Sequence, residues 1–291
     1  MSILSTKAML ATLSISSWTA RKHDRAATEE INKSKEAAVD ASRVNKLLVP
    51  KDALAPIEKI TGAARNFHYE YSMPWADNGA RLLPAAAYVA YMARIRTFRE
   101  QFDAAVSEFV AEYETHKEAA RKQLGQMFRE ADYPTASDIH RRFSFSVAID
   151  PVPAAEDFRV SIGDTQADLI RAEIEARANE QLQGAMNDLF RRVQDVCGRM
   201  VERLTSYKPG AKGERAEGTF RDSLVENVRD LAAILPALNV TGDARLNDIA
   251  KRMEAELTRH DAKDLREDLE ARQETAKAAA AILADVSDFL A

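Results

Sequence analysis

The sequence predicts a mainly α-helical protein built on a long antiparallel, coiled-coil-like helical hairpin, with a small β-hairpin near its tip and flanking helices. The 291 residues include only 10 Gly and 9 Pro, whereas 30% of them are charged. This composition favours long, charge-covered helices over an all-β sandwich or a glycine-rich nucleotide-binding fold. Two long segments also space their apolar residues by threes and fours, and a short segment between them alternates apolar with polar residues.

The N-terminal region, residues 1–82, is expected to contain one strand followed by helices. Residues 10–19 alternate between apolar and polar side chains, which is typical of a half-buried strand. A polar helix with few apolar anchors is predicted over 26–46, and an amphipathic helix over 52–71. Residues 73–79 combine Pro, Asp, Asn and Gly and predict a turn.

The central region, residues 83–207, is expected to form the helical hairpin. From residue 84 to residue 129 no proline follows Pro84, and a single apolar stripe continues throughout. A helix of that length would extend on the order of 70 Å and needs a long partner to cover its stripe. Residues 165–207 begin with a capping-box pattern and carry a matching stripe, so the two segments are predicted to pair antiparallel.

A β-hairpin at about residues 143–162 is predicted in the connection between these two helices. Residues 143–149 alternate, residues 150–153 contain two prolines typical of a turn, and residues 158–162 alternate again. Because an isolated hairpin is marginally stable in water, its apolar face is expected to pack on another part of the molecule or on another subunit.

The polar, glycine-rich segment 208–218 is the expected domain linker. The C-terminal region, residues 219–291, then reads as helical. Its helices are predicted at 220–235, 244–258 and 262–290, separated by proline and by Asn-, Gly- and Asp-containing turns.

Signatures of catalysis are missing from the sequence, and neither a cofactor nor a metal site is expected. The segment Gly210–Gly213 lacks the spacing of a phosphate-binding loop, and the five histidines are scattered. His116 lies within an apolar stripe and is expected to be a packed, hydrogen-bonded residue. Cys197 lies one turn from Val193 and is expected to be buried in its helix. We therefore do not expect an enzyme or a small-molecule substrate.

Two basic clusters are candidates for binding nucleic acid. In the first, an aromatic ring lies beside cationic residues, as stacking on single-stranded nucleic acid requires, although a core position for the ring is the alternative. The second is a basic stretch over residues 191–221 that would follow a phosphate backbone if it formed one face; an ordinary solvated helix face is the alternative. The residues are Trp18, Arg21, Lys22 and Arg25 in the first cluster, and Arg191, Arg192, Arg199, Arg203, Lys208 and Lys212 in the second.

The charge balance and the single cysteine bear on location and partners. The 41 Lys and Arg against 46 Asp and Glu leave a formal net charge of -5, which weighs against nucleic acid as the main partner. A single Cys fits a reducing compartment, and no apolar run is long enough to span a membrane. A cytoplasmic protein without a membrane partner is expected.

Three groups of residues resemble an uncharacterised phage- and prophage-associated family of helical proteins. They are Leu13–Lys22, Pro50–Leu54, and Trp75 with Asn78–Ala85, and the resemblance covers roughly the first two-thirds of the chain. The resemblance implies a phage-encoded protein of the host cytoplasm, encoded near replication or recombination genes or a AAA+ ATPase. It brings no activity and no catalytic residues.

The long apolar stripes favour a non-enzymatic structural or interaction protein that self-associates through its helices, as a homo-oligomer or with a protein partner. The alternative hypothesis is a nucleic-acid-binding accessory factor in phage replication or recombination, acting through the two basic clusters.

Overall fold

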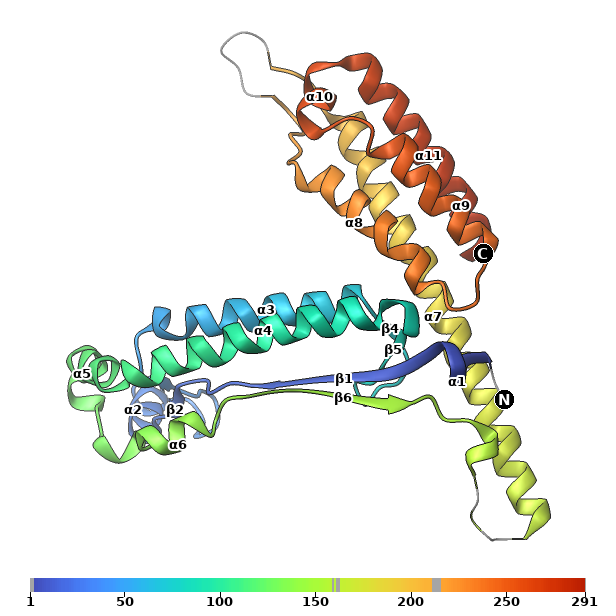
Figure 1. Cartoon of the computed structure of the whole chain (residues 1–291). Coiled ribbons are helices and arrows are strands. Elements are labelled where there is room, and N and C mark those ends of the chain that lie inside the picture. The colour runs from blue at the N-terminus through green and yellow to red at the C-terminus, as the bar shows by residue number, and fades with distance from the viewer. Residues whose placement is uncertain (1–2, 159, 161–162, 211–215, 291) are drawn as a thin grey trace. The chain divides into compact units, whose positions relative to one another are not determined.

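A computed structural model describes residues 3–158, 160, 163–210 and 216–290 of the chain (Figure 1). With 67% helix and 11% strand, the protein is mainly helical and carries a small antiparallel sheet, which confirms the predicted class. The chain forms two compact units that each combine distant segments. Unit 1 comprises Met1–Thr12, Tyr69–Tyr91 and Ala148–Ala291, and unit 2 comprises Leu13–His68 and Met92–Val147.

The larger sheet has the strand order β4-β5-β1-β6. Its strands are β4 (Met73–Pro74), β5 (Arg81–Pro84), β1 (Ala8–Ser16) and β6 (Ser144–Pro151). In the antiparallel register of β1 and β5, Ala8 lies opposite Pro84 and Ala11 opposite Arg81. The N-terminal strand expected from the alternation of residues 10–19 is therefore present.

The predicted β-hairpin over 143–162 is corrected by the pairing of β6. Its first arm is a strand, but the neighbour of β6 in the sheet is β1, far away in the sequence. Residues 159, 161 and 162 of the expected second arm lie outside the described residues, and Phe158 and Val160 belong to no strand. Pairing with β1 has a physical advantage, because the ring of Phe145 then packs against Phe102 in the core, whereas a free hairpin would expose it.

Unit 2 contains a small sheet, most of the two helices α3 and α4, and several shorter elements. A two-stranded antiparallel sheet pairs β2 (Arg21–His23) with β3 (Asn45–Leu47). The helices are α2 (Arg25–Ser34), α3 (Ala55–Glu70) after the 3₁₀ turn η1 (Lys51–Leu54), α4 (Ala85–Ala111), α5 (Tyr113–Leu124) and α6 (Ala136–His140). Two further 3₁₀ turns are η2 (Gly125–Met127) and η3 (Glu130–Asp132).

The polar helix expected over 26–46 ends much earlier, at Ser34. Asp24 caps its N-terminus by accepting a hydrogen bond from the backbone N–H of Ala27 at 3.1 Å. Near its end, the buried Asn32 donates to the carbonyl of Val39 at 2.8 Å and so holds the following chain in a loop. A segment with so few apolar anchors gains little from remaining helical, and side-chain hydrogen bonds stabilise the loop instead.

The single helix expected over 84–129 is divided into α4 and α5 and ends at Leu124. The division at Glu112 is slight, because the N–H of Glu112 still bonds to the carbonyl of Glu108 at 3.1 Å. Gly125 ends α5 with a φ of 52°, a left-handed conformation that favours glycine. The predicted stripe is buried at Phe98, Phe102 and Phe109.

Unit 1 is a helical bundle around α7 (Asp164–Ser206), whose 43 residues confirm a long helix in the second predicted segment. The other helices are α1 (Ile3–Lys7), α8 (Ser223–Leu238), α9 (Ala244–Arg252), α10 (Ala262–Glu267) and α11 (Leu269–Leu290). Also present are η4 (Ala155–Asp157) and the π-helical turn η5 (Met253–Leu257). The three expected C-terminal helical segments are thus all helical.

The main partner of α7 is α11, which runs antiparallel to it, and α8 also packs on it (Figure 1). The hairpin expected between residues 84–129 and 165–207 is therefore not established. The stripe of α7 that we assigned to that partner is buried at Leu189, Val193 and Met200 within unit 1. The C-terminal helices have aliphatic stripes of their own, and these pack against the buried stripe of α7 within unit 1.

The expected linker at 208–218 is described only at its two ends, because residues 211–215 lie outside the described residues. Lys208 and Glu217 form an antiparallel bridge, with backbone hydrogen bonds of 3.1 and 3.0 Å. Gly218 closes this turn at a φ of 64°, where a Cβ atom would lie 2.6 Å from the carbonyl oxygen of Ser206. None of the described helices is long and apolar enough to cross a membrane.

Candidate functional site

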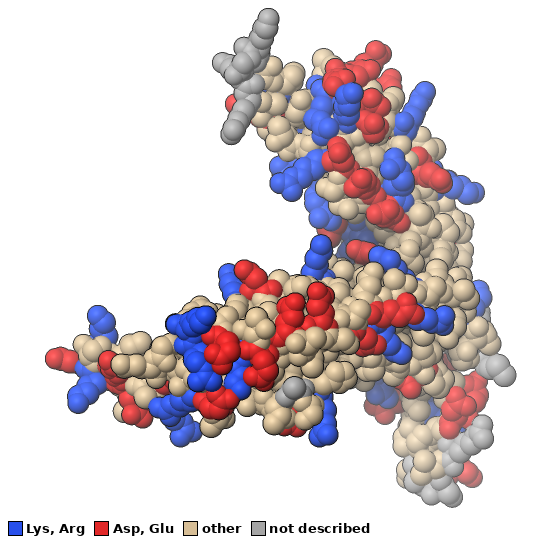
Figure 2. Space-filling model, turned by 60° about the vertical axis from the view of Figure 1, so that its left-hand side comes forward, with Lys and Arg blue, Asp and Glu red and all other residues tan. Residues whose placement is uncertain are grey.

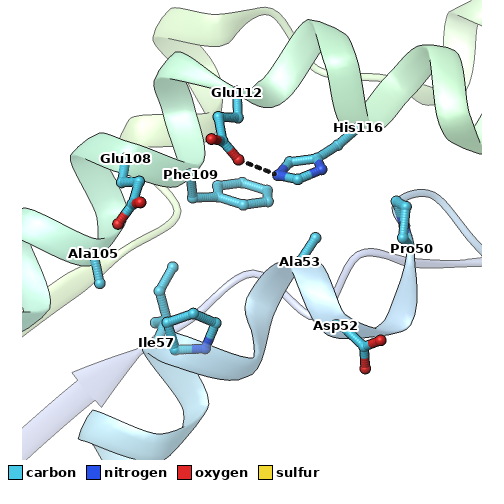
Figure 3. A pocket seen from close by; sticks show the side chains of 10 residues that line it. Pro50, Asp52, Ala53, Ile57, Ala105, Glu108, Phe109, Glu112 and His116 are labelled. Carbon is cyan, nitrogen blue, oxygen red and sulfur yellow. Dashed lines mark ion pairs between the residues drawn. The ribbon is translucent and has the colours of Figure 1, made fainter.

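Unit 2 contains a groove that brings apolar and acidic side chains together. It has a volume of about 330 Å³ and lies between η1 and the start of α3 on one side and the end of α4 and the start of α5 on the other (Figure 3). It is lined by Pro50, Asp52, Ala53, Pro56, Ile57, Ala105, Glu108, Phe109, Glu112 and His116.

The floor of the groove is apolar and fixed in place. Ile57 and Phe109 are 1% and 3% exposed, so both belong to the core of unit 2. The Phe109 ring packs at 6.2 Å from Trp18 and at 5.8 Å from Phe143, measured between ring centroids. Such contacts lock the ring orientation, and the groove is preformed.

The rim of the groove is acidic. Glu108 and Glu112 extend from the α4 side, while Asp52 lies at the outer edge on η1 (Figure 3). His116 stacks on Phe109 at 5.5 Å, and its Nε2 lies 3.5 Å from Oε2 of Glu112. The expectation that His116 is a packed, hydrogen-bonding residue of the stripe is consistent with this geometry.

A buried ion cluster joins three segments of unit 2 beside α2. The Lys46 ammonium is 3% exposed and lies 3.1 Å from Oδ2 of Asp24 and 2.7 Å from Oδ2 of Asp132. It also donates a hydrogen bond of 2.7 Å to the carbonyl of Met127. The cluster thereby ties β3, the N-cap of α2 and the loop after α5 to one another.

In the cluster, the ionised carboxylate of Asp24 and the ionised ammonium of Lys46 stabilise each other. The backbone N–H of Ala27 and the Lys46 ammonium hold the pKa of Asp24 below its ordinary value, although burial opposes this. Burial by itself lowers the pKa of Lys46, but the hydrogen bonds to Asp132 and Asp24 outweigh it, and the net pKa is raised. Both groups are charged at neutral pH, and the arrangement is that of a structural ion pair.

The first predicted nucleic-acid cluster is only partly exposed. Trp18 is 8% exposed and its ring contacts Phe109 and Tyr113, so it occupies the core and cannot stack on a base in this structure. Arg21 and Arg25 are exposed. The side chain of Lys22 is 52% exposed, and its ammonium lies 3.5 Å from Asp132. The ring thus takes the core position that was the alternative for it, in the segment between β1 and β2.

The second predicted cluster is divided among several roles. Arg192 is structural, since it donates to the backbone carbonyls of Glu70 and Ser72 at 2.8 and 2.6 Å and pairs with Asp188. Lys208 pairs with Glu217 at 3.5 Å, and Lys212 lies outside the described residues. The exposed members on α7 are Arg191, Arg199 and Arg203.

Acidic residues interrupt the positive charge on α7. At about 100° per residue, Asp195 and Glu202 fall between Arg191, Arg199 and Arg203 on the same side of the helix. Acidic and basic side chains are likewise interspersed over the visible face in Figure 2. In its described part on α7, the basic stretch does not form one continuous face for a phosphate backbone.

The first half of α7 exposes a small apolar group on one side of the helix and carries partly buried residues on the other. Leu169 is 67% exposed, Ala172 and Ala176 are exposed, and Ile170 and Ile174 are only half-buried. In the second half the stripe is buried throughout, at Ala185, Met186, Leu189, Val193, Cys197, Met200 and Leu204. The stripe itself is therefore half-buried at Ile170 and Ile174 and fully buried farther along the helix, whereas Leu169, Ala172 and Ala176 lie on the opposite, exposed side of α7.

Sequence reasoning identified neither the groove nor the ion cluster. His116 was predicted as a residue of the apolar stripe, but no role was predicted for the acidic residues beside it. Lys46 was assigned to the end of a helix that does not reach it. The one available signal was a lysine set among the apolar residues Val44, Leu47 and Leu48.

Comparison of the chain with protein-family models, with curated proteins and with solved structures finds no match. Among the described residues, no group of three or more His, Cys, Asp or Glu side chains is placed to hold a metal ion. The candidate sites therefore rest on the geometry of this chain alone.

Proposed function

We propose that the protein is a non-enzymatic interaction protein that self-associates through the first half of α7. The observation that carries the proposal is that Leu169, Ala172 and Ala176 form an exposed apolar group on one side of the first half of α7. The 43 residues of α7 correspond to roughly 65 Å of helix, whereas the 22 residues of its antiparallel partner α11 correspond to roughly 33 Å. Helix α11 is therefore too short to cover the whole length of α7, and the exposed apolar group lies in the first half.

A second copy of the chain is the partner that fits the exposed apolar group. Its own α7 presents the same residues at the same spacing, and a two-fold contact between like surfaces is the commonest form of oligomer. The alanines at 172 and 176 allow close helix approach beside Leu169, and the pair Arg171 and Asp168, 2.8 Å apart, borders the surface with both signs of charge. The coiled-coil-like pairing expected from the sequence is then made between two chains.

The setting of this function follows from the sequence alone. The family resemblance supports a phage-encoded protein in the host cytoplasm. A single, free and buried cysteine fits that reducing compartment. In this proposal the protein acts through its surfaces and needs no cofactor or small-molecule substrate.

Light scattering coupled to size-exclusion chromatography tests the proposal. At tens of micromolar the wild-type chain is expected to elute as a dimer or larger oligomer, and Leu169→Glu is expected to shift it to a monomer because it places a charge in the interface. Leu269→Glu is the matched control, since Leu269 is 58% exposed on α11 and lies outside the proposed surface. A monomeric wild type, or equal behaviour of the two variants, would contradict the proposal.

A nucleic-acid-binding accessory function remains the second candidate, and one observation favours it. Arg21 and Arg25 are both exposed and lie four residues apart in the sequence of unit 2, which has 19 Lys and Arg against 16 Asp and Glu. Binding through them would weaken steeply as salt is added. Absence of binding to single- and double-stranded probes at low salt would exclude this function.

A further inference from the structure

We infer that the groove of unit 2 is a docking site for a basic peptide segment of a protein partner, and that it receives an arginine or lysine side chain. Such a side chain has an aliphatic stem and a cationic head, so it needs an apolar floor beside an acidic rim. The groove supplies both, because Ile57 and Phe109 form the floor and Glu108 and Glu112 stand above it (Figure 3).

The charges around the groove are complementary to a cation. Among the described residues, those lining it include three acids and no lysine or arginine. Glu112 has only the imidazole of His116 nearby at 3.5 Å, and the structure gives no basic partner to Glu108 in the described part of the chain. The exposed carboxylate of Glu108 and the second oxygen of Glu112 can form charge-assisted hydrogen bonds with an incoming guanidinium or ammonium group.

The size of the groove favours one side chain of a larger partner. Its volume of about 330 Å³ is at the lower end of the ~300–1,000 Å³ that is usual for small-ligand sites. The apolar floor continues beyond the acidic rim to Pro50 and Pro56, where neighbouring apolar residues of a peptide can pack. The ligand class is therefore a peptide in which basic and apolar residues alternate.

This inference is independent of self-association. The groove lies entirely in unit 2, whereas the exposed apolar group of α7 lies entirely in unit 1. A chain that remains monomeric can still bind the peptide, and an oligomer can fail to bind it.

Fluorescence anisotropy with labelled peptides tests the site. The probe is a short peptide of repeated Ala-Leu-Arg, and its counterpart of repeated Ala-Leu-Glu has the same length and apolar content. We expect the basic peptide to bind the full-length protein and the acidic one not to bind. Free arginine amide, added as a competitor, distinguishes a small cationic ligand from a peptide, and we expect it to compete only weakly.

Two double variants identify the groove as the binding site. Glu108→Gln with Glu112→Gln removes two charges from the rim and is expected to weaken peptide binding roughly tenfold, which corresponds to about 1.4 kcal/mol. Glu100→Gln with Asp103→Asn removes two exposed acidic charges from the same helix outside the groove, and about the wild-type affinity is expected.

The inference is overturned if the basic peptide does not bind the wild-type protein, if both peptides bind equally, or if the two double variants lose the same affinity. Tight binding of arginine amide alone would overturn the peptide as the ligand. All four substituted residues are exposed, so circular dichroism is expected to show that each variant folds like the wild type.

Discussion

The two units are stabilised by different kinds of core. In unit 2, five of the twelve buried residues of the hydrophobic cluster are aromatic, and a charged cluster around Lys46 lies close to the same core. In unit 1, only three of 36 such residues are aromatic, and aliphatic stripes of the helices pack on one another. Unit 1 therefore depends on the spacing of many interchangeable side chains, whereas unit 2 depends on a few specific contacts.

Charge is also distributed unequally. Unit 1 carries 22 Lys and Arg against 30 Asp and Glu, whereas unit 2 carries 19 against 16. The small excess of base in unit 2 does not form a binding surface by itself, because Lys46 is buried and Lys22 lies beside Asp132. Unit 1 thus has a formal charge of -8 and unit 2 one of +3, which together give the overall charge of -5.

The largest effect is expected from Lys46→Met. Removing the ammonium leaves Asp24 and Asp132 buried without their partner, and breaking a buried pair in this way costs about 3–5 kcal/mol. Urea unfolding of unit 2 should show the loss. Lys22→Met is the matched control, because it removes a half-exposed lysine from the same Asp132, and a cost below about 1 kcal/mol is expected. Equal losses would contradict a specific role for the buried cluster.

A somewhat smaller effect is expected from Leu189→Ala in unit 1. Leu189 is fully buried where α7 meets its helical partners, and such truncations cost about 2–5 kcal/mol. Leu189→Met keeps the volume and should cost less than about 1.5 kcal/mol. Hydrogen exchange should place the loss in the helices of unit 1. A Met variant as unstable as the Ala variant would contradict the tolerance that we ascribe to this core.

The pH dependence of stability should differ between unit 2 and its Asp24→Asn variant. The pKa of Asp24 is lowered on folding, so its contribution is present above its ordinary pKa of 3.8 and is lost as pH falls through the lower folded value. The pKa of Lys46 is raised on folding, so its contribution is present below 10.5 and is lost as pH rises through the higher folded value. Both losses of stability are measured by following the thermal unfolding temperature from pH values below 3.8 to values above 10.5.

The acid-side loss should be smaller in Asp24→Asn than in the wild type, because the amide does not titrate. An identical acid dependence in the two proteins would show that Asp24 does not contribute as the geometry indicates.

The smallest perturbation uses the only thiol of the chain as a reporter. Cys197 is fully buried in unit 1, and burial raises the pKa of its thiol to about 12. In the native protein its reaction with a thiol reagent at pH 8 should be roughly a thousandfold slower than after unfolding, because thiolate is scarce and access is blocked. Rapid labelling without denaturant would show that the core of unit 1 opens. If Lys46→Met leaves the labelling rate unchanged, the two units are independent.

The features found in advance were those encoded by neighbouring residues. Apolar spacing predicted the helix of residues 165–207 and the helices of the C-terminal region, and alternation predicted β1 and the first arm at β6. The interruption at Glu112 and the early end of α2 were missed. The early end of α2 depends on hydrogen bonds of Asn32 that compete with helix continuation, whereas at Glu112 the helical hydrogen bonds continue and the interruption is slight.

The sequence by itself determined that this is a mainly helical protein with two long amphipathic segments and a buried cysteine, because periodicity is a property of contiguous residues. Only the tertiary structure decided that α11 covers α7, that β1 pairs with β6, and that Trp18 lies in the core. The same holds for the bond from Lys46 to Met127, which joins residues 81 positions apart. Many stripes and charges in one chain are mutually compatible, and their pairing is chosen by packing and burial over the whole fold.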